Sequence, residues 1–172
     1  MEEETVGVTD VDVAGNGAAP GSFEARMQER RRQREQRSTE LFTPPGFEDL
    51  FRVELRVVGY RRLADISLRH QRQADEGMQA LYIAADQLLE ATVAFHMLTD
   101  DGRLEPIEDG TWVTVARAFD PNLDQTTRPR VALIRLLGDG MGVIRLHADW
   151  NEWNTSGNAK VDRELAEDFP ET

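Results

Sequence analysis

The sequence predicts a mainly α fold: a small helical domain with a short strand or hairpin component, flanked by disordered N- and C-terminal tails. Two segments favour helices. Residues 75–97 place apolar side chains at i, i+3, i+4 and i+7 spacing, and residues 141–154 gather their apolar side chains, two Trp among them, on one helix face. Residues 1–21 and 156–172 lack such a period and are acidic, which predicts tails that do not fold.

The composition limits the classes of function. The chain has 172 residues, of which 40% are hydrophobic and 30% charged, so it allows one domain with tails and not two full domains. A net charge of −12 repels phosphate backbones, and the lack of Cys excludes disulfides, thiolate zinc ligands and Cys nucleophiles. No apolar run reaches the roughly 20 residues of a membrane span. The acidic start, residues 1–4, is unlike a signal peptide. We therefore expect a soluble, cytosolic protein.

A polar helix is expected before the globular domain. Ser22 can cap a helix over residues 23–41, in which Arg and Glu interleave and apolar residues are few. We therefore treat residues 22–42 as an Arg/Glu-rich helix. A Pro-Pro-Gly run at residues 44–46 stops that helix, and the globular domain is predicted to span 44–155.

The remaining elements follow from local patterns. Alternating apolar and polar residues predict a strand over 50–60, and apolar spacing predicts a helix over 63–73. Residues 104–107 read as a short extended piece between two turns, and residues 130–137 as a helix ended by glycine. Residues 112–119 fit either a strand or a short helix, and the pattern does not decide between them.

No motif predicts a catalytic, cofactor-binding or metal site. The loop 138–142 has GxGxG spacing in place of the GxGxxG of a dinucleotide site, so a helix–turn–helix connection explains it better. The three His residues, 70, 96 and 147, are far apart and lack the local pairing of a zinc site. The carboxylates of residues 100–109 do not have calcium-loop spacing, and no Ser/His/Asp order suggests a hydrolase. We expect no enzyme, no cofactor and no metal.

Two features indicate contacts with another protein. The Arg-rich helix contains too many Glu and too few aromatic residues for an RNA-binding segment, which leaves a solvated or partner-docking helix. The two Trp residues near the C-terminus are most simply core, and an interface role is the alternative because Trp is enriched at binding hot spots. The candidate partner-binding residues are Arg30, Arg31, Arg34, Leu41, Phe42, Trp150 and Trp153.

An ordered set of short runs over residues 44–172 carries a resemblance to a known family. The runs are Pro45-Gly46-Phe47-Glu48, Phe51-Arg52-Val53, Gly59-Tyr60-Arg61, the segment 78–91, Asp100-Asp101-Gly102-Arg103-Leu104-Glu105-Pro106-Ile107, Arg130-Val131-Ala132-Leu133, and the Trp-ended segment 143–153. In this order they resemble the tail assembly chaperones of long, non-contractile-tailed bacteriophages (siphophages) of actinobacterial hosts. The loop 138–142 is richer in glycine than the family pattern.

The resemblance implies a non-enzymatic role in the host cell cytoplasm. Chaperones of this family bind the tape measure protein, a very long helical chain, and keep it soluble until tail tube subunits assemble around it. The resemblance implies the tail tube protein and a frameshifted longer form of the chaperone itself as further partners. It implies neither nucleic acid nor a membrane, and it is compatible with a homo-oligomer.

Two other interpretations stay open from the sequence. A structural head–tail or tail component of the virion would form a stable ring and remain in the particle. A small enzyme or nucleotide-binding regulator would use the glycine-rich loop 138–142.

Overall fold

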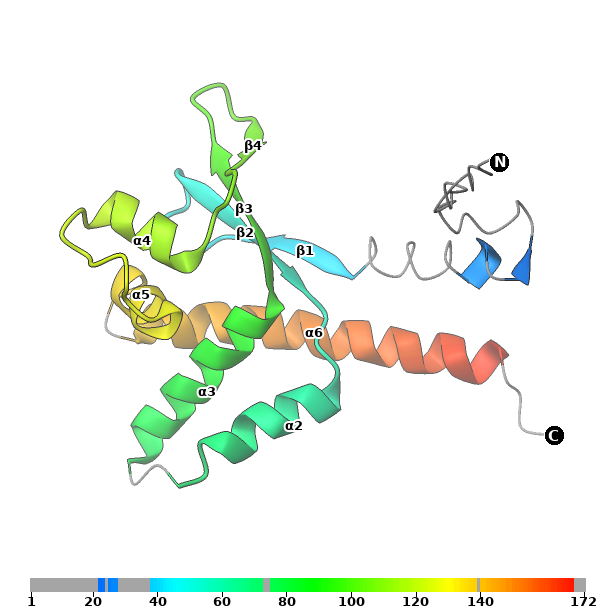
Figure 1. Cartoon of the computed structure of the whole chain (residues 1–172). Helices are drawn as coiled ribbons and strands as arrows, with labels where there is room; N and C mark the ends of the chain where they lie inside the picture. The colour runs from blue at the N-terminus through cyan, green and yellow to red at the C-terminus, as the bar shows by residue number, and fades with distance from the viewer. Residues whose placement is uncertain (1–21, 24, 28–37, 73–74, 139, 169–172) are drawn as a thin grey trace, which may run out of the picture. The chain divides into compact units, whose positions relative to one another are not determined.

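The computed structural model describes most of the chain (Figure 1). The described residues are 22–23, 25–27, 38–72, 75–138 and 140–168, with side chains described as far as residue 156. The chain divides into two units, residues 1–37 and 38–172, and each is considered by itself. In the first unit, the Ser22 hydroxyl accepts a hydrogen bond from the Ala25 amide at 3.1 Å, as a helix N-cap does. The predicted tail 1–21 and the Arg-rich stretch 28–37 lie outside the described residues.

The second unit is a mixed α/β fold, so the prediction of a mainly α domain was wrong. A four-stranded antiparallel sheet has the strand order β1-β2-β3-β4. The strands are β1 (Thr39–Phe42), β2 (Phe51–Arg56), β3 (Thr92–Leu98) and β4 (Leu104–Pro106). The helices are α2 (Tyr60–Arg69), α3 (Glu76–Ala91), α4 (Trp112–Phe119), α5 (Pro129–Leu136) and α6 (Met141–Asp168). The β3–β4 hairpin and α2 lie at opposite ends of this unit (Figure 1).

Two predicted helices were too long because strands occupy their last residues. Helix α3 ends at Ala91, and Thr92 adopts an extended conformation while its hydroxyl donates to the Leu88 carbonyl at 2.7 Å. The β-branched pair Thr92 and Val93 favours extended backbone, and the apolar residues after it fit a strand as well as a helix. In the same way, β1 occupies the end of the helix that was predicted over 23–41.

The segment 112–119, which the sequence left undecided, is helix α4. A capping box starts it: the Thr111 hydroxyl accepts from the Thr114 amide, and the Thr114 hydroxyl accepts from the Thr111 amide at 2.7 Å. Helix α6 continues to Asp168, well past the predicted end at residue 154. The prediction of a C-terminal tail without a fold was therefore wrong for the backbone up to Asp168.

The other predicted elements are confirmed with shifted bounds, as β2, α2, β4 and α5. The connection between α5 and α6 is the predicted helix–turn–helix. Gly138 and Gly140 adopt φ of +70° and +95°, conformations that favour glycine. A Cβ at Gly140 would also lie 3.0 Å from the Leu81 side chain, so the close approach of this turn to α3 needs glycine as well.

The core covers one face of the sheet. Phe51, Val53 and Leu55 alternate along β2, are at most 5% exposed, and point to the same side as Phe95 of β3, which pairs with Val53. The helices close this side with a set of buried apolar residues: Ala85 and Leu88 of α3, Trp112 of α4, Leu133 and Leu136 of α5, and Val143, Leu146 and Trp150 of α6. We call this the covered face of the sheet.

Candidate partner-binding surface

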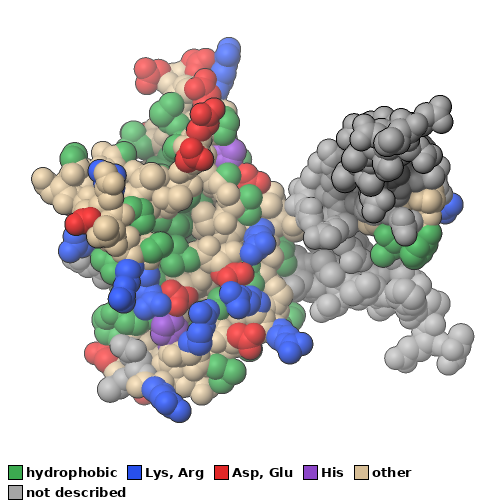
Figure 2. Space-filling model, in the orientation of Figure 1, with side chains coloured by type: hydrophobic (Ala, Val, Ile, Leu, Met, Phe, Trp, Pro, Cys, Tyr) green, Lys and Arg blue, Asp and Glu red, His purple; other side chains and the backbone are tan. Residues whose placement is uncertain are grey.

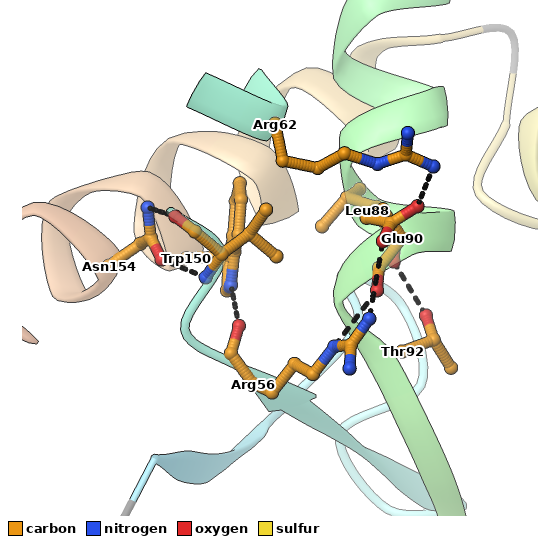
Figure 3. A network of polar contacts seen from close by, with 8 residues as sticks. Arg56, Arg62, Leu88, Glu90, Thr92, Trp150 and Asn154 are labelled. Carbon is orange, nitrogen blue, oxygen red and sulfur yellow. Dashed lines mark hydrogen bonds and ion pairs between the residues drawn. The ribbon is translucent and has the colours of Figure 1, made fainter. Parts of the chain in front are cut away.

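Two wholly buried side chains of α6 hold the connection between β2 and α2 (Figure 3). Trp150 Nε1 donates to the Arg56 carbonyl at 3.1 Å. Asn154 accepts from the Val58 amide at 2.7 Å and donates to the Val58 carbonyl at 3.2 Å. Both side chains are 0% exposed. Trp150, one of the predicted partner-binding residues, therefore has its contacts within the core.

A second contact at this junction lies on the surface. Arg56 and Arg62 converge on the Glu90 carboxylate, at 3.2 and 2.8 Å (Figure 3). The hydrogen bond from Arg62 is the main cause that lowers the pKa of Glu90. Because both Arg side chains are about half exposed, these pairs contribute little to the free energy of unfolding. They connect the end of β2 and the start of α2 to the last turn of α3.

Phe42 and Trp153, two more predicted partner-binding residues, contact each other. Their ring centroids lie 5.7 Å apart in an edge-to-face arrangement, and both are half-buried against the core. Phe42 pairs with Val53 in the sheet, so it points to the covered face. The contact joins β1 to α6, and both rings remain partly exposed.

Leu41, the neighbour of Phe42, points to the opposite face of the sheet. It pairs with Glu54, which in turn pairs with Ala94, and alternation places all three on the side away from the core. We call this side the open face. Its residues are Thr39 and Leu41 of β1, Arg52, Glu54 and Arg56 of β2, Ala94, His96 and Leu98 of β3, and Leu104 and Pro106 of β4.

A groove of about 360 Å³ lies on the β1 side of the open face. It is lined by Thr39, Glu40, Leu41, Glu54 and His96. Two of these lining residues pair with each other: His96 Nε2 and Glu54 Oε2 lie 3.0 Å apart, with side chains 21% and 25% exposed. The groove thus combines an aliphatic wall with a hydrogen-bonded acid–imidazole pair. Such a surface suits a side chain of another polypeptide.

Two leucines of the open face are far more exposed than the apolar residues that β2 places on the covered face. Leu41 is 43% exposed and Leu104 is 40% exposed. The outer edge of β1 adds backbone groups: the Ser38 carbonyl accepts from the Val57 amide, so alternation aims the amide and carbonyl of Thr39 and Leu41 away from β2. A segment of a partner could pack on the aliphatic side chains of this face, and an extended segment could also form hydrogen bonds with the free backbone edge of β1.

A separate cluster of charged groups joins α2, α3 and α5. Arg130 binds both oxygens of Asp86 at 2.7 Å, and His70 Nε2 lies 2.8 Å from Asp86 Oδ2. The Arg130 guanidinium also lies 4.9 Å from the centre of the Tyr82 ring. Burial would raise the pKa of Asp86, but hydrogen bonds from Arg130 and His70 outweigh burial and lower it. Since both oxygens are engaged, the cluster braces three helices.

Sequence reasoning missed this cluster. It did not single out Asp86 and treated His70 as an isolated residue. The signal that could have found it is weak: Tyr82 and Asp86 lie four residues apart on one helix, and their partners come from distant helices. A third polar contact, from His147 Nε2 to Gln87 Oε1 at 2.7 Å, ties α6 to α3. Burial lowers the pKa of His147.

The described part of the chain does not include the remaining predicted site residues. Arg30, Arg31 and Arg34 lie outside it. Within the residues that are described, no three His, Asp or Glu side chains converge to hold a metal ion. None of the helices searched there is long and apolar enough to span a membrane.

Comparisons with known proteins add no relative. No protein-family model matches the chain, and no curated protein or solved structure matches it either. The open face is therefore assessed on its own chemistry.

Proposed function

We propose that this protein is a phage tail assembly chaperone that binds a tape measure protein on the open face of its sheet and keeps it soluble while the tail tube assembles. The client is taken from the resemblance of residues 44–172 to that family. The observation that supports a binding surface is the exposure of Leu41 and Leu104 on a sheet whose other face buries the apolar residues of β2 under the helices.

The chemistry of the open face suits a client that must later be released. A sheet face with scattered aliphatic residues offers apolar burial worth roughly 25 cal/mol per Å² of area, without a deep pocket that would hold one ligand tightly. His96 and Glu54 lie within hydrogen-bond distance of each other, at 3.0 Å. These polar groups of the open face therefore keep a hydrogen-bond partner when the client leaves. Several such weak contacts along a long client hold the chaperone on the client, and each contact can still be displaced by tail tube subunits.

The charge of the chain suits the same role. A net charge of −12 keeps a complex with an aggregation-prone client soluble through repulsion between complexes. Exposed charge pairs contribute only about 0–1 kcal/mol each, so the apolar residues of the open face supply most of the affinity in this proposal.

Co-expression with the tape measure protein of the same phage tests the proposal. The test variant is Leu41→Thr with Leu104→Thr, because Thr removes apolar surface, adds no charge and favours strands. The control variant is Val131→Thr with Met141→Thr, which removes exposed apolar side chains from the helical side, 40% and 75% exposed. We expect the soluble yield of the client to rise with the native chaperone and with the control, and to fall several-fold with the test variant.

Two outcomes contradict the proposal at different levels. If the native protein leaves the client wholly insoluble, the chaperone function is wrong. If both double variants preserve the soluble yield equally, the function stands and the open face is the wrong surface. Detection of the protein in purified virions by mass spectrometry would favour a structural tail component instead.

The Arg-rich segment is tested by a separate deletion. Removal of residues 1–37 leaves the sheet intact, whereas removal of residues 1–42 would also delete β1. A loss of client solubility on deletion of 1–37 would assign a role to Arg30, Arg31 and Arg34, and full activity would restrict the client contact to residues 38–172.

A further inference from the structure

Helix α2 has an outward face that the domain does not use. Ile66 is its one fully buried apolar residue, and the helix packs mainly on α3. Tyr60 and Leu68, two turns apart on one side of the helix, are 54% and 56% exposed. Arg61 of the helix and Arg72 in the turn that follows it are also exposed. Large apolar side chains next to cations form a surface with the character of a docking site.

Two of the positive charges at α2 have no ion pair with a described residue. Residues 60–72 contain four Arg against one Asp, although the whole chain has a net charge of −12. Arg62 is engaged by Glu90 at 2.8 Å. Neither Arg61 nor Arg72 has an ion pair or hydrogen bond with any described residue. The occupant that fits this face therefore carries carboxylates next to an apolar contact, since Arg pairs with carboxylates through its planar fork.

The β3–β4 hairpin supplies that chemistry. Residues 99–110 contain five acidic residues and one Arg, and Arg103 is paired with Asp101 at 3.0 Å. Glu105 and Glu108 are exposed and have no ion pair among the described side chains. Met97, 47% exposed, pairs with Glu105 across the hairpin and so lies on the same side of it. The hairpin thus presents carboxylates beside an apolar side chain.

The two surfaces are too far apart to meet within one copy. Figure 1 places α2 and the hairpin at opposite ends of the unit. Figure 2 shows mostly Asp and Glu side chains at the hairpin end, and Lys and Arg side chains interspersed with Asp and Glu over the end where α2 lies. We propose that α2 of one copy binds the β3–β4 hairpin of a second copy, so that copies associate head to tail. A contact of this kind is heterologous and yields rings or open chains.

A charge-swap experiment on the full chain tests this contact. The α2 variant is Arg61→Glu with Arg72→Glu, and the hairpin variant is Glu105→Arg with Glu108→Arg. A control variant, Arg135→Glu with Arg145→Glu, makes the same change in net charge as the α2 variant at exposed positions elsewhere. Sedimentation velocity is measured at an ionic strength of about 0.01 M and of about 1 M, which shortens the Debye length from roughly 30 Å to roughly 3 Å.

We expect the native protein and the control to associate at low ionic strength and to separate at high ionic strength. The α2 variant and the hairpin variant alone should each associate at least tenfold more weakly. An equimolar mixture of the two should associate again, because the acidic α2 of one meets the basic hairpin of the other. The chain that carries all four substitutions should likewise recover association.

The proposal is overturned if the native protein is monomeric at both ionic strengths, or if the mixture fails to restore association after both single variants have lost it. Association that neither variant weakens also overturns it. If the native chain stays monomeric but binds a synthetic Glu- and Leu-rich helical peptide in an α2-dependent manner, α2 serves a different acidic partner and self-association is excluded. Thermal unfolding of each variant shows that the loss does not arise from misfolding.

Discussion

The covered and open faces of the sheet differ in what closes them. On the covered face, Phe51, Val53 and Leu55 are at most 5% exposed and lie under the helices. On the open face, Leu41 and Leu104 are 43% and 40% exposed and surround a hydrogen-bonded His–Glu pair. Both faces carry aliphatic residues, yet folding uses one set alone. The aliphatic residues of the open face are therefore explained better by binding than by stability.

Leu55→Thr should have the largest effect on stability. Leu55 is 0% exposed on the covered face, so Thr leaves a cavity and buries a hydroxyl group without a prepared partner. We expect the free energy of unfolding to fall by about 3 to 5 kcal/mol in urea denaturation. A loss below about 1 kcal/mol would mean that the covered face is not the core.

Asn154→Ala should have the next largest effect. The substitution removes two hydrogen bonds, the one that the Val58 amide donates to Asn154 at 2.7 Å and the one that the Val58 carbonyl accepts from it at 3.2 Å. Since these groups are buried, we expect a loss of about 2 to 4 kcal/mol. The control is Asn151→Ala, one turn earlier on the same helix and exposed, which should change the free energy of unfolding by less than about 0.5 kcal/mol. Equal losses for the two variants would show that the hydrogen bonds between Asn154 and Val58 do not stabilise the fold.

Acidification should lower the free energy of unfolding by a smaller amount than either of these substitutions. Burial lowers the pKa of His147 below its ordinary value of 6.5, so the unfolded chain takes up a proton before the folded protein does. The stability that depends on neutral His147 is complete above the unfolded pKa and is lost as the pH falls below it. Asp86, whose pKa is also lowered, loses its contribution at lower pH, as its carboxylate becomes protonated.

The variant His147→Gln separates these two contributions. It keeps a side-chain donor for Gln87 but cannot titrate, so its unfolding midpoint should fall less than that of the native protein between about pH 7 and about pH 5. Parallel curves for the two proteins would contradict the assignment to His147.

Leu41→Thr should have the smallest effect on stability, which makes it the counterpart of Leu55→Thr. The residue is in a strand, largely exposed and opposite Glu54, and Thr suits such a position. We expect a change within about 0.5 kcal/mol in urea denaturation. A loss comparable to that of Leu55→Thr would show that the open face is covered in the folded protein and is not a docking surface.

The sequence predicted elements better than it predicted their assembly. The strand at β2 and the helices α2 and α5 follow from local periodicity and glycine stops. The mainly α prediction was wrong because residues 92–98 fit both a helix and a strand, and the pairing of β3 with β2 decides between them. Helix 112–119 could not be identified from alternation, although the Thr111–Thr114 capping pair was present in the sequence.

The candidate surface was predictable in part. Leu41 was singled out from the sequence, but its neighbours on the open face come from three other strands, and register alone brings Leu104 and His96 to the same side. Trp150 was singled out because Trp is frequent at interfaces. In the structure its indole is buried in the core and donates a hydrogen bond to the Arg56 carbonyl. One sequence does not tell which face of an amphipathic element is covered, because that depends on distant segments.

Site-specific photo-crosslinking tests the central claim most directly. A photoreactive amino acid replaces Leu41 on the open face in one variant and Val131, 40% exposed on the helical side, in the other, and each is co-expressed with the tape measure protein. The account predicts that the client crosslinks to position 41 at several times the yield found at position 131. Equal yields, or a crosslink at 131 alone while the client stays soluble, would contradict the assignment of the open face as the client-binding surface.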